Sequence, residues 1–329
     1  MKMSPGRTLL LIISLFTTPL FARPQQQQQD PGDQPIKLGT ELVALDALVL
    51  NKKSGAVIKG LTKDDFTIYE DGIKQLITHF SQDRLPLSIL LLLDASGSVG
   101  PIIDEVRDEG IRALQQLRPD DEVAVMAFGK WATVTQDFTK DRQLIMKGIG
   151  AIEWMGNWIR EGTYINEAVY QAAKHLSKAS NPDSRRALII VTDNISNHLP
   201  GLGHSQSEAL EELMESGAVL SGLMVGDFQA AVIEYRKKGY SLTDSIGSYA
   251  GETGGVIVQV EKSDAVEKLG RIIERLRARY SFGYSPLNAK QDGKFRKIKL
   301  KIAPAVEKRE GDIAIITRKG YYARARSGK

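Results

Sequence analysis

The sequence predicts an α/β fold in which helices cover both faces of a doubly wound, mostly parallel β-sheet. Two observations lead to this prediction. Across residues 86–278, continuous apolar segments alternate with amphipathic ones, which is typical of buried parallel strands joined by helices. On either side, residues 39–84 and 280–329 read as β-strands. We therefore expect a small β-rich part, formed by both ends of the chain, beside the α/β centre.

Six strands and four helices account for the pattern of the α/β centre. The predicted strands are 88–94, 122–128, 132–138, 187–193, 218–226 and 254–260. The predicted helices are 102–117, 164–176, 207–216 and 264–280, where apolar residues recur at helical spacing. Only Gly129, Lys130 and Trp131 join the second strand to the third, so this pair is expected to form a hairpin with one antiparallel edge strand.

The flanking segments carry signals for antiparallel strands. Asp71-Gly72 lies between two β-rich arms and predicts a hairpin. In 294–302, Lys and Arg alternate with Phe and Ile, which indicates a half-buried strand whose charged face meets water. We expect 39–84 to pack with 280–329 as one small β domain, into which the α/β domain, 85–279, is inserted. Separate β pieces packed on the α/β core would produce the same pattern.

The first residues have the three parts of a secretory signal. Lys2 and Arg7 precede an apolar run from Leu9 to Phe16, and small residues end at Ala22. We expect a signal peptide at 1–22 and a secreted or periplasmic protein whose mature chain has no transmembrane segment, because the apolar run is too short to span a bilayer. A disordered or membrane-anchoring start is the alternative. The polar, glutamine-rich residues 23–38 are expected to be a flexible leader.

The composition is that of a soluble globular protein, with 42% hydrophobic and 26% charged residues. The chain has no cysteine, which excludes disulfides and thiolate metal sites. The net charge of +4 hides a basic block, because 268–329 contains 18 Lys and Arg against 5 Asp and Glu. Such a block can meet nucleic acid, anionic lipid or an acidic polymer. The alternation in 294–302 favours a solvated face instead. The expected secreted location argues against nucleic acid as the partner of this block.

Polar, oxygen-bearing side chains gather where the predicted strands end. In doubly wound sheets, ligands bind beyond the carboxyl ends of the strands. Three such residues follow the first strand, one ends the fourth, and one precedes the second helix: Asp94, Ser96, Ser98, Asp193 and Thr163. Two carboxylates and three hydroxyls form the all-oxygen ligand set of a hard divalent cation such as Mg²⁺, with Mn²⁺ and Ca²⁺ as alternatives.

These residues resemble the metal-ion-dependent adhesion site of the von Willebrand factor A (vWA) domain, whose motif is Asp-x-Ser-x-Ser followed by a distant Thr and a distant Asp. The resemblance covers roughly 86–278 and implies the Rossmann-like vWA fold. It implies that Ser96, Ser98 and Thr163 bind the ion through their hydroxyls, while Asp94 and Asp193 act directly or through water. The segments around "GLTKDDFTIYEDG" and "GKFRKIKLKI" also resemble the flanks of secreted bacterial proteins that carry this domain.

The resemblance implies a protein-binding or adhesion module rather than an enzyme. A partner protein would present an Asp or Glu carboxylate to the open position of the ion. Trp154 and Trp158 precede Thr163 and are candidates for the rim of the partner-binding surface, with self-packing as the alternative. Asn194 replaces the glycine that commonly follows the second Asp of the motif. It is expected to keep the left-handed backbone there and is a third candidate for the rim.

Three other interpretations of the same residues stay open. The first is that the acid and hydroxyl side chains only cap helices. The second is a structural or assembly protein whose metal site is idle. The third is a serine hydrolase using Ser96 or Ser98 with Asp193 and His198, although the G-x-S-x-G motif of such enzymes is missing. The sequence leaves the oligomeric state undetermined.

Overall fold

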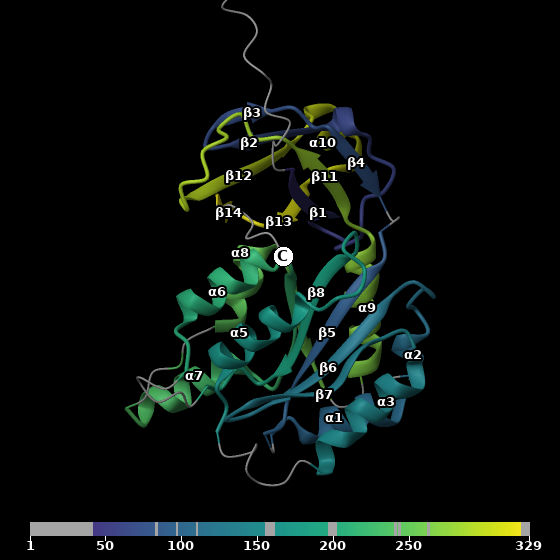
Figure 1. The fold of residues 1–329 in the computed structure, drawn as a ribbon, viewed down its shortest axis with the longest axis vertical. Coiled ribbons are helices and arrows are strands. Elements are labelled where there is room, and N and C mark those ends of the chain that lie inside the picture. The colour runs from purple at the N-terminus through teal and green to yellow at the C-terminus, as the bar shows by residue number, and fades with distance from the viewer. Residues whose placement is uncertain are drawn as a thin grey trace, which may run out of the picture. The chain divides into compact units, whose positions relative to one another are not determined.

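The computed structural model describes most of the chain beyond residue 41 (Figure 1). The described residues are 42–82, 85–96, 98–109, 111–154, 162–196, 203–239, 242, 245–261 and 264–323. Residues 40–329 form one compact unit. The predicted signal peptide and leader lie outside the described residues, so both stay predictions.

The central sheet has six strands in the order β10-β9-β8-β5-β6-β7. Their bounds are β5 (Leu87–Asp94), β6 (Glu122–Phe128), β7 (Ala132–Thr139), β8 (Arg185–Thr192), β9 (Val219–Val225) and β10 (Ile257–Val260). Every neighbouring pair is parallel except β6 and β7, which are antiparallel. The structure therefore confirms the doubly wound, mostly parallel sheet and its antiparallel edge strand.

Helices cover both faces of this sheet (Figure 1). One core lies under α1 (Gly100–Glu109), α2 (Ile111–Leu114), α3 (Arg142–Gly150) and α9 (Ala265–Arg277). The other lies under α5 (Ile165–Leu176), α6 (Gln206–Glu215), α7 (Phe228–Lys237) and α8 (Ser245–Thr253). Each residue of β5 and β6 is buried, which explains why these strands read as continuous apolar runs. Among the described residues, every helix is too short or too polar to span a bilayer.

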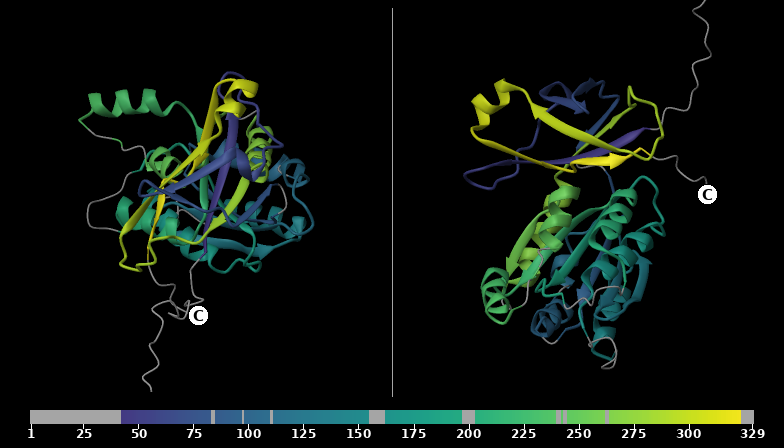
Figure 2. Two further views of the ribbon diagram at one scale, coloured as in Figure 1. Left: turned by 90° about the horizontal axis from the view of Figure 1, so that it is seen from above. Right: turned by 90° about the vertical axis from the view of Figure 1, so that its left-hand side faces the viewer.

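Two further sheets combine strands from both ends of the chain (Figure 2). One has the order β13-β1-β11-β4 and the other β14-β12-β2-β3. Their bounds are β1 (Val43–Asn51), β2 (Phe66–Glu70), β3 (Ile73–Gln75), β4 (His79–Gln82), β11 (Tyr280–Tyr284), β12 (Phe295–Ile302), β13 (Ile313–Thr317) and β14 (Gly320–Tyr322), with the short helix α10 (Pro304–Glu310). The predicted hairpin is confirmed, since β2 and β3 pair antiparallel around Asp71 and Gly72, both with positive φ.

A third apolar core lies between these two sheets. Phe66 of β2 packs against Tyr280 and Phe282 of β11, with ring centroids 5.1 and 4.9 Å apart. β1 pairs with β11 and β13, while β2 pairs with β12, so N-terminal and C-terminal strands stabilise one another. The division of the chain into separate domains stays a prediction, because all of these elements belong to one compact unit.

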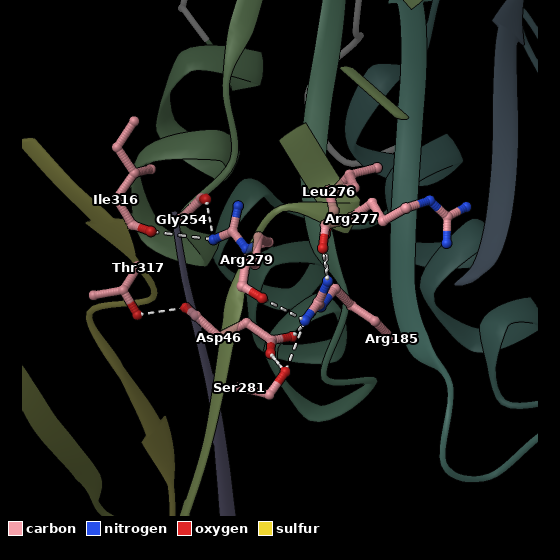
Figure 3. Close-up of polar contacts among 9 residues, drawn as sticks. All are labelled: Asp46, Arg185, Gly254, Leu276, Arg277, Arg279, Ser281, Ile316 and Thr317. Carbon is pink, nitrogen blue, oxygen red and sulfur yellow. Dashed lines mark hydrogen bonds and ion pairs between the residues drawn. The ribbon is translucent and has the colours of Figure 1, made fainter. Parts of the chain in front are cut away.

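A buried arginine joins the central sheet to the strands of the chain ends (Figure 3). The Arg185 guanidinium, at the start of β8, donates to Asp46 Oδ2 of β1 at 3.1 Å and to Ser281 Oγ of β11 at 2.7 Å. It also donates to the backbone carbonyls of Leu276, Arg277 and Arg279, where α9 leads into β11. Burial alone would raise the pKa of Asp46, but the charges of Arg185 and Arg279 and the hydrogen bond from Ser281 lower it.

We predict that Arg185→Met lowers the free energy of unfolding by about 3–5 kcal/mol, because it removes the ion pair with Asp46 and the donor to three backbone carbonyls. Chemical denaturation of the full chain measures this change. Arg186→Met, one residue along β8, is the matched control: its guanidinium bonds the Ser216 carbonyl and its side chain is only partly buried. A loss below about 1 kcal/mol for Arg185→Met would contradict the role given to this network.

Candidate metal centre

The candidate site lies where the strand order of the central sheet reverses. From β5 the chain continues to β6 on one side, and it later returns to β8 on the other side. The carboxyl ends of β5 and β8 therefore border the crevice in which doubly wound sheets bind ligands. Asp94 is the last residue of β5, and Asp193 follows the last residue of β8.

Asp94 ties the ends of these two strands together. Its Oδ1 accepts a hydrogen bond from the Ser96 amide at 2.9 Å, and its Oδ2 accepts one from Thr192 Oγ1 at 2.7 Å. Asp94 is 0% exposed. The Ser96 bond turns the chain immediately after the strand, which explains locally why a buried strand ends on Asp-x-Ser.

The Asp94 carboxylate is buried, and within the described part of the chain no cationic side chain shifts its pKa. Burial raises its pKa to about 6, against the hydrogen bonds from Thr192 and Ser96 that lower it, and Asp193 raises it further. Of the described groups that shift this pKa, none is a Lys, Arg or His. A buried carboxylate is costly unless it is paired with a positive charge or protonated. The site therefore favours either a proton or a bound cation.

Ser96, Ser98 and Asp193 form a connected set of oxygens next to Asp94. Ser98 Oγ donates to Asp193 Oδ2 at 2.7 Å, and Ser96 Oγ lies 3.2 Å from Ser98 Oγ. The other Asp193 oxygen accepts the Ile195 amide at 2.9 Å, which holds the carboxylate in place. The loops after β5 and β8, about 95 residues apart in sequence, thus present their predicted ligands to each other.

Thr163 reaches the same edge through its backbone. Ser196 Oγ, in the loop after β8, donates to the Thr163 carbonyl at 3.0 Å. The next amide, of Tyr164, donates to the Gly129 carbonyl at 2.8 Å, just after β6. Thr163 is 6% exposed and directly precedes the N-cap residue of α5. The structure therefore brings the three segments that carry the five predicted ligands to one edge of the sheet.

The donor chemistry fits a hard divalent cation. The set has two carboxylates and three hydroxyls, and such cations prefer oxygen ligands. Within the described part of the chain, no group of three or more His, Cys, Asp or Glu residues is placed to hold a metal. A site here would thus depend on its serine and threonine hydroxyls as well as on carboxylates.

The three residues predicted for the rim have different outcomes. Asn194 has a φ of 62°, as expected for the position of the missing glycine. Its side chain is 0% exposed, and its Oδ1 accepts the Ile246 amide of α8 at 3.3 Å. The prediction that it contributes to a partner-binding rim does not fit this burial, because the side chain holds α8 instead. Trp154 ends the 3-10 helix η2 (Ala151–Trp154), but its side chain and all of Trp158 lie outside the described residues.

Sequence reasoning missed Trp131 as a residue of this edge. Phe128, at the end of β6, is in register with Asp94, and the Gly129 carbonyl contacts Tyr164. The hairpin tip that follows carries Trp131, which is 57% exposed, with Lys130 Nζ 6.0 Å from its ring centroid. The signal was present in the sequence, because a hairpin after a parallel strand begins at the ligand-binding edge.

Comparison with known proteins supports the vWA interpretation for part of the chain. Residues 89–196 match the family model described as von Willebrand factor type A domain, and this segment contains all five predicted ligands. No curated protein sequence gives a significant match to the chain.

Several solved structures are similar at low identity. The conserved hypothetical protein BatB from Bacteroides thetaiotaomicron is 18% identical, with 58% of this chain and 98% of that chain covered and a TM-score of 0.43. A von Willebrand factor type A protein from Catenulispora acidiphila is 12% identical, with 78% and 73% covered and a TM-score of 0.47. The family match thus concerns residues 89–196, which form a vWA-type segment of the chain.

Proposed function

We propose that this chain is a secreted or periplasmic protein-binding module that depends on a divalent cation, with Mg²⁺ as the favoured ion. The observation that carries the proposal is the fully buried Asp94 carboxylate. It has hydrogen-bond donors and a second carboxylate around it, but no described cationic side chain is among the groups that shift its pKa. The vWA match of residues 89–196 and the signal-like residues 1–22 are consistent with it.

Each residue of the site has a role in this proposal. Ser96, Ser98 and Thr163 would hold the ion through hydroxyl oxygens, and Asp94 and Asp193 would balance its charge directly or through water. Ser98 already directs its proton to Asp193, which leaves its oxygen lone pairs free to face a cation. When bound, the ion would supply a positive centre with an open position for the carboxylate of a partner protein.

Trp131 and Lys130 would form the rim beside this position. An exposed tryptophan next to a charged anchor is typical of residues that dominate protein interfaces. The serine-hydrolase alternative has less support, because Ser98 donates directly to Asp193 and no described histidine is bonded to either serine. His198, which that mechanism needs, lies outside the described residues.

We predict that Mg²⁺ stabilises the full chain, because it would bind the folded state and not the unfolded one. At a concentration one hundred times the dissociation constant the gain is about 2.7 kcal/mol. Thermal unfolding in chelator and across a Mg²⁺ titration measures it, with Ser96→Ala/Ser98→Ala as the variant that should not respond. Ser205→Ala/Ser207→Ala, which removes two hydroxyls 3.0 Å apart at the start of α6, is the matched control. An equal response of wild type and the Ser96/Ser98 variant would contradict the site.

We also predict a pH dependence that originates from Asp94. Its pKa is raised in the folded protein to about 6, so without a cation the stabilising contribution of its proton is present below about pH 4. As the pH rises through about 6 that contribution is lost, and the free energy of unfolding falls by about 2–3 kcal/mol. The stabilisation by added Mg²⁺ should increase over the same pH range, because Mg²⁺ competes with the proton for Asp94.

Unfolding measured in chelator from pH 4 to pH 7 tests this prediction. Asp94→Asn removes the titrating group, so the free energy of unfolding of this variant should fall less from pH 4 to pH 7 than that of wild type. A wild-type curve that matches the Asp94→Asn curve throughout would show that Asp94 does not carry the dependence.

A third prediction concerns the open position and the rim. Short peptides with one central Asp should displace water from Mn²⁺ bound to the chain. This displacement lowers the relaxation rate of the water protons, which is the quantity measured. Peptides with Asn in its place should not. A Phe beside the Asp should tighten binding several-fold, and Trp131→Ala should remove this gain while leaving the binding of the plain Asp peptide intact. Binding that ignores the Asp-to-Asn change would contradict the carboxylate role.

A further inference from the structure

The sheet β14-β12-β2-β3 has one covered face and one open face. Along β12, Arg296, Ile298 and Leu300 are buried, whereas the lysines between and beyond them are exposed. Ile298 and Leu300 belong to the core between the two terminal sheets. Because side chains alternate across a strand, the exposed residues of β12 point away from that core.

The strand register gathers lysines on the open face. Lys299 of β12 is paired with Tyr69 of β2, and Tyr69 is paired with Lys74 of β3. Lys301 Nζ lies 4.9 Å from the centroid of the Tyr69 ring, and Lys297 precedes Lys299 on the same face. We call these four residues the lysine face: Lys74, Lys297, Lys299 and Lys301. Asp71, at the β2–β3 turn, accepts the Lys297 amide at its Oδ1.

Aromatic and aliphatic side chains border the lysine face. Phe295 of β12 and Tyr322 of β14 are paired, with ring centroids 5.3 Å apart. At the opposite edge, two aliphatic side chains are strongly exposed: Leu76 at 78% and Leu287 at 71%. The Leu287 amide donates to Gln75 Oε1 at 3.1 Å, so Leu287 lies beside β3, at the same edge as Leu76. We call these two residues the aliphatic rim.

We propose that the lysine face and the aliphatic rim bind the surface of a membrane that contains anionic lipids. Lysines attract anionic headgroups, tyrosine and phenylalanine favour the headgroup level, and exposed aliphatic side chains gain by entering the boundary with the acyl chains. A soluble polyanion would use the lysines but would gain nothing from the aliphatic rim. The rim therefore favours a lipid surface, and this inference does not depend on the cation site.

The absence of cysteine from the chain allows a local test. The full chain carries an environment-sensitive fluorophore on Leu76→Cys or Leu287→Cys, or on Gln229→Cys of α7, an exposed position elsewhere. With vesicles of phosphatidylglycerol and phosphatidylcholine, the first two labels should shift to the blue and the Gln229→Cys label should not. Pure phosphatidylcholine vesicles should give no shift. The local label separates this face from any contribution of the N-terminal residues.

Charge variants test the lysine face. Lys74→Glu/Lys299→Glu/Lys301→Glu should weaken vesicle binding by at least about one hundred-fold at low salt, since each lysine contributes about five-fold. The control Lys147→Glu/Lys174→Glu/Lys237→Glu makes the same change in net charge at exposed positions elsewhere. Thermal unfolding confirms that both variants are folded.

Several outcomes would overturn the proposal. They are the absence of a shift at Leu76→Cys and Leu287→Cys with anionic vesicles, an equal shift with neutral vesicles, and equal losses in the two charge variants. A response of the labels to a soluble polyanion such as polyglutamate, without a response to vesicles, would assign the face to soluble polyanions instead.

Discussion

The burial of one carboxylate, Asp94, sets the chemistry of the candidate site. The end of β5 lies between β6 and β8 under helices on both faces, so its last side chain has no access to water. Thr192 and the Ser96 amide supply hydrogen bonds, but these do not offset the cost of burying the charge, and its pKa rises to about 6. The loops that surround Asp94 carry hydroxyls and a second carboxylate, which add electron-rich oxygens rather than a positive charge.

Arg185, in the same sheet, is a buried charge whose partners lie within the chain. It starts β8, at the end of that strand opposite to Asp193. Its guanidinium donates to Asp46, to Ser281 and to three backbone carbonyls. A buried charge with its partners built in stabilises the contact between elements. At the other edge of the same sheet, no described cationic side chain is among the groups that shift the pKa of Asp94. This contrast is the physical reason to expect an external cation there.

Much of the fold could be predicted from the sequence, because its strands carry strong periodic signals. β5 and β8 are continuous apolar runs, and Asp71-Gly72 marks a turn. The helices α3, α7 and α8 could not be predicted in this way. α8 contains Gly247 and Gly251, which weaken its helical signal. It is held by tertiary contacts such as the buried Tyr249, whose hydroxyl donates to Asn166.

The candidate site was predictable to the extent that it depends on strand ends. Asp94, Ser98 and Asp193 come together because parallel strands end at one edge. The burial of Asn194 was not predictable, since it arises from the contact with α8, an element that the sequence did not indicate. Trp131 follows a parallel strand in a three-residue connection, so the sequence places it at the ligand-binding edge only through the end of that strand.

The most direct test of the cation site is a crystal structure of the full chain soaked in Mn²⁺, with anomalous scattering recorded for the manganese. The account predicts a single strong anomalous peak among Asp94, Ser96, Ser98, Thr163 and Asp193, at about 2.0–2.3 Å from the serine hydroxyl oxygens. An occupied manganese position elsewhere, with none at this edge of the sheet, would contradict it and leave the five residues as caps of their loops and helices.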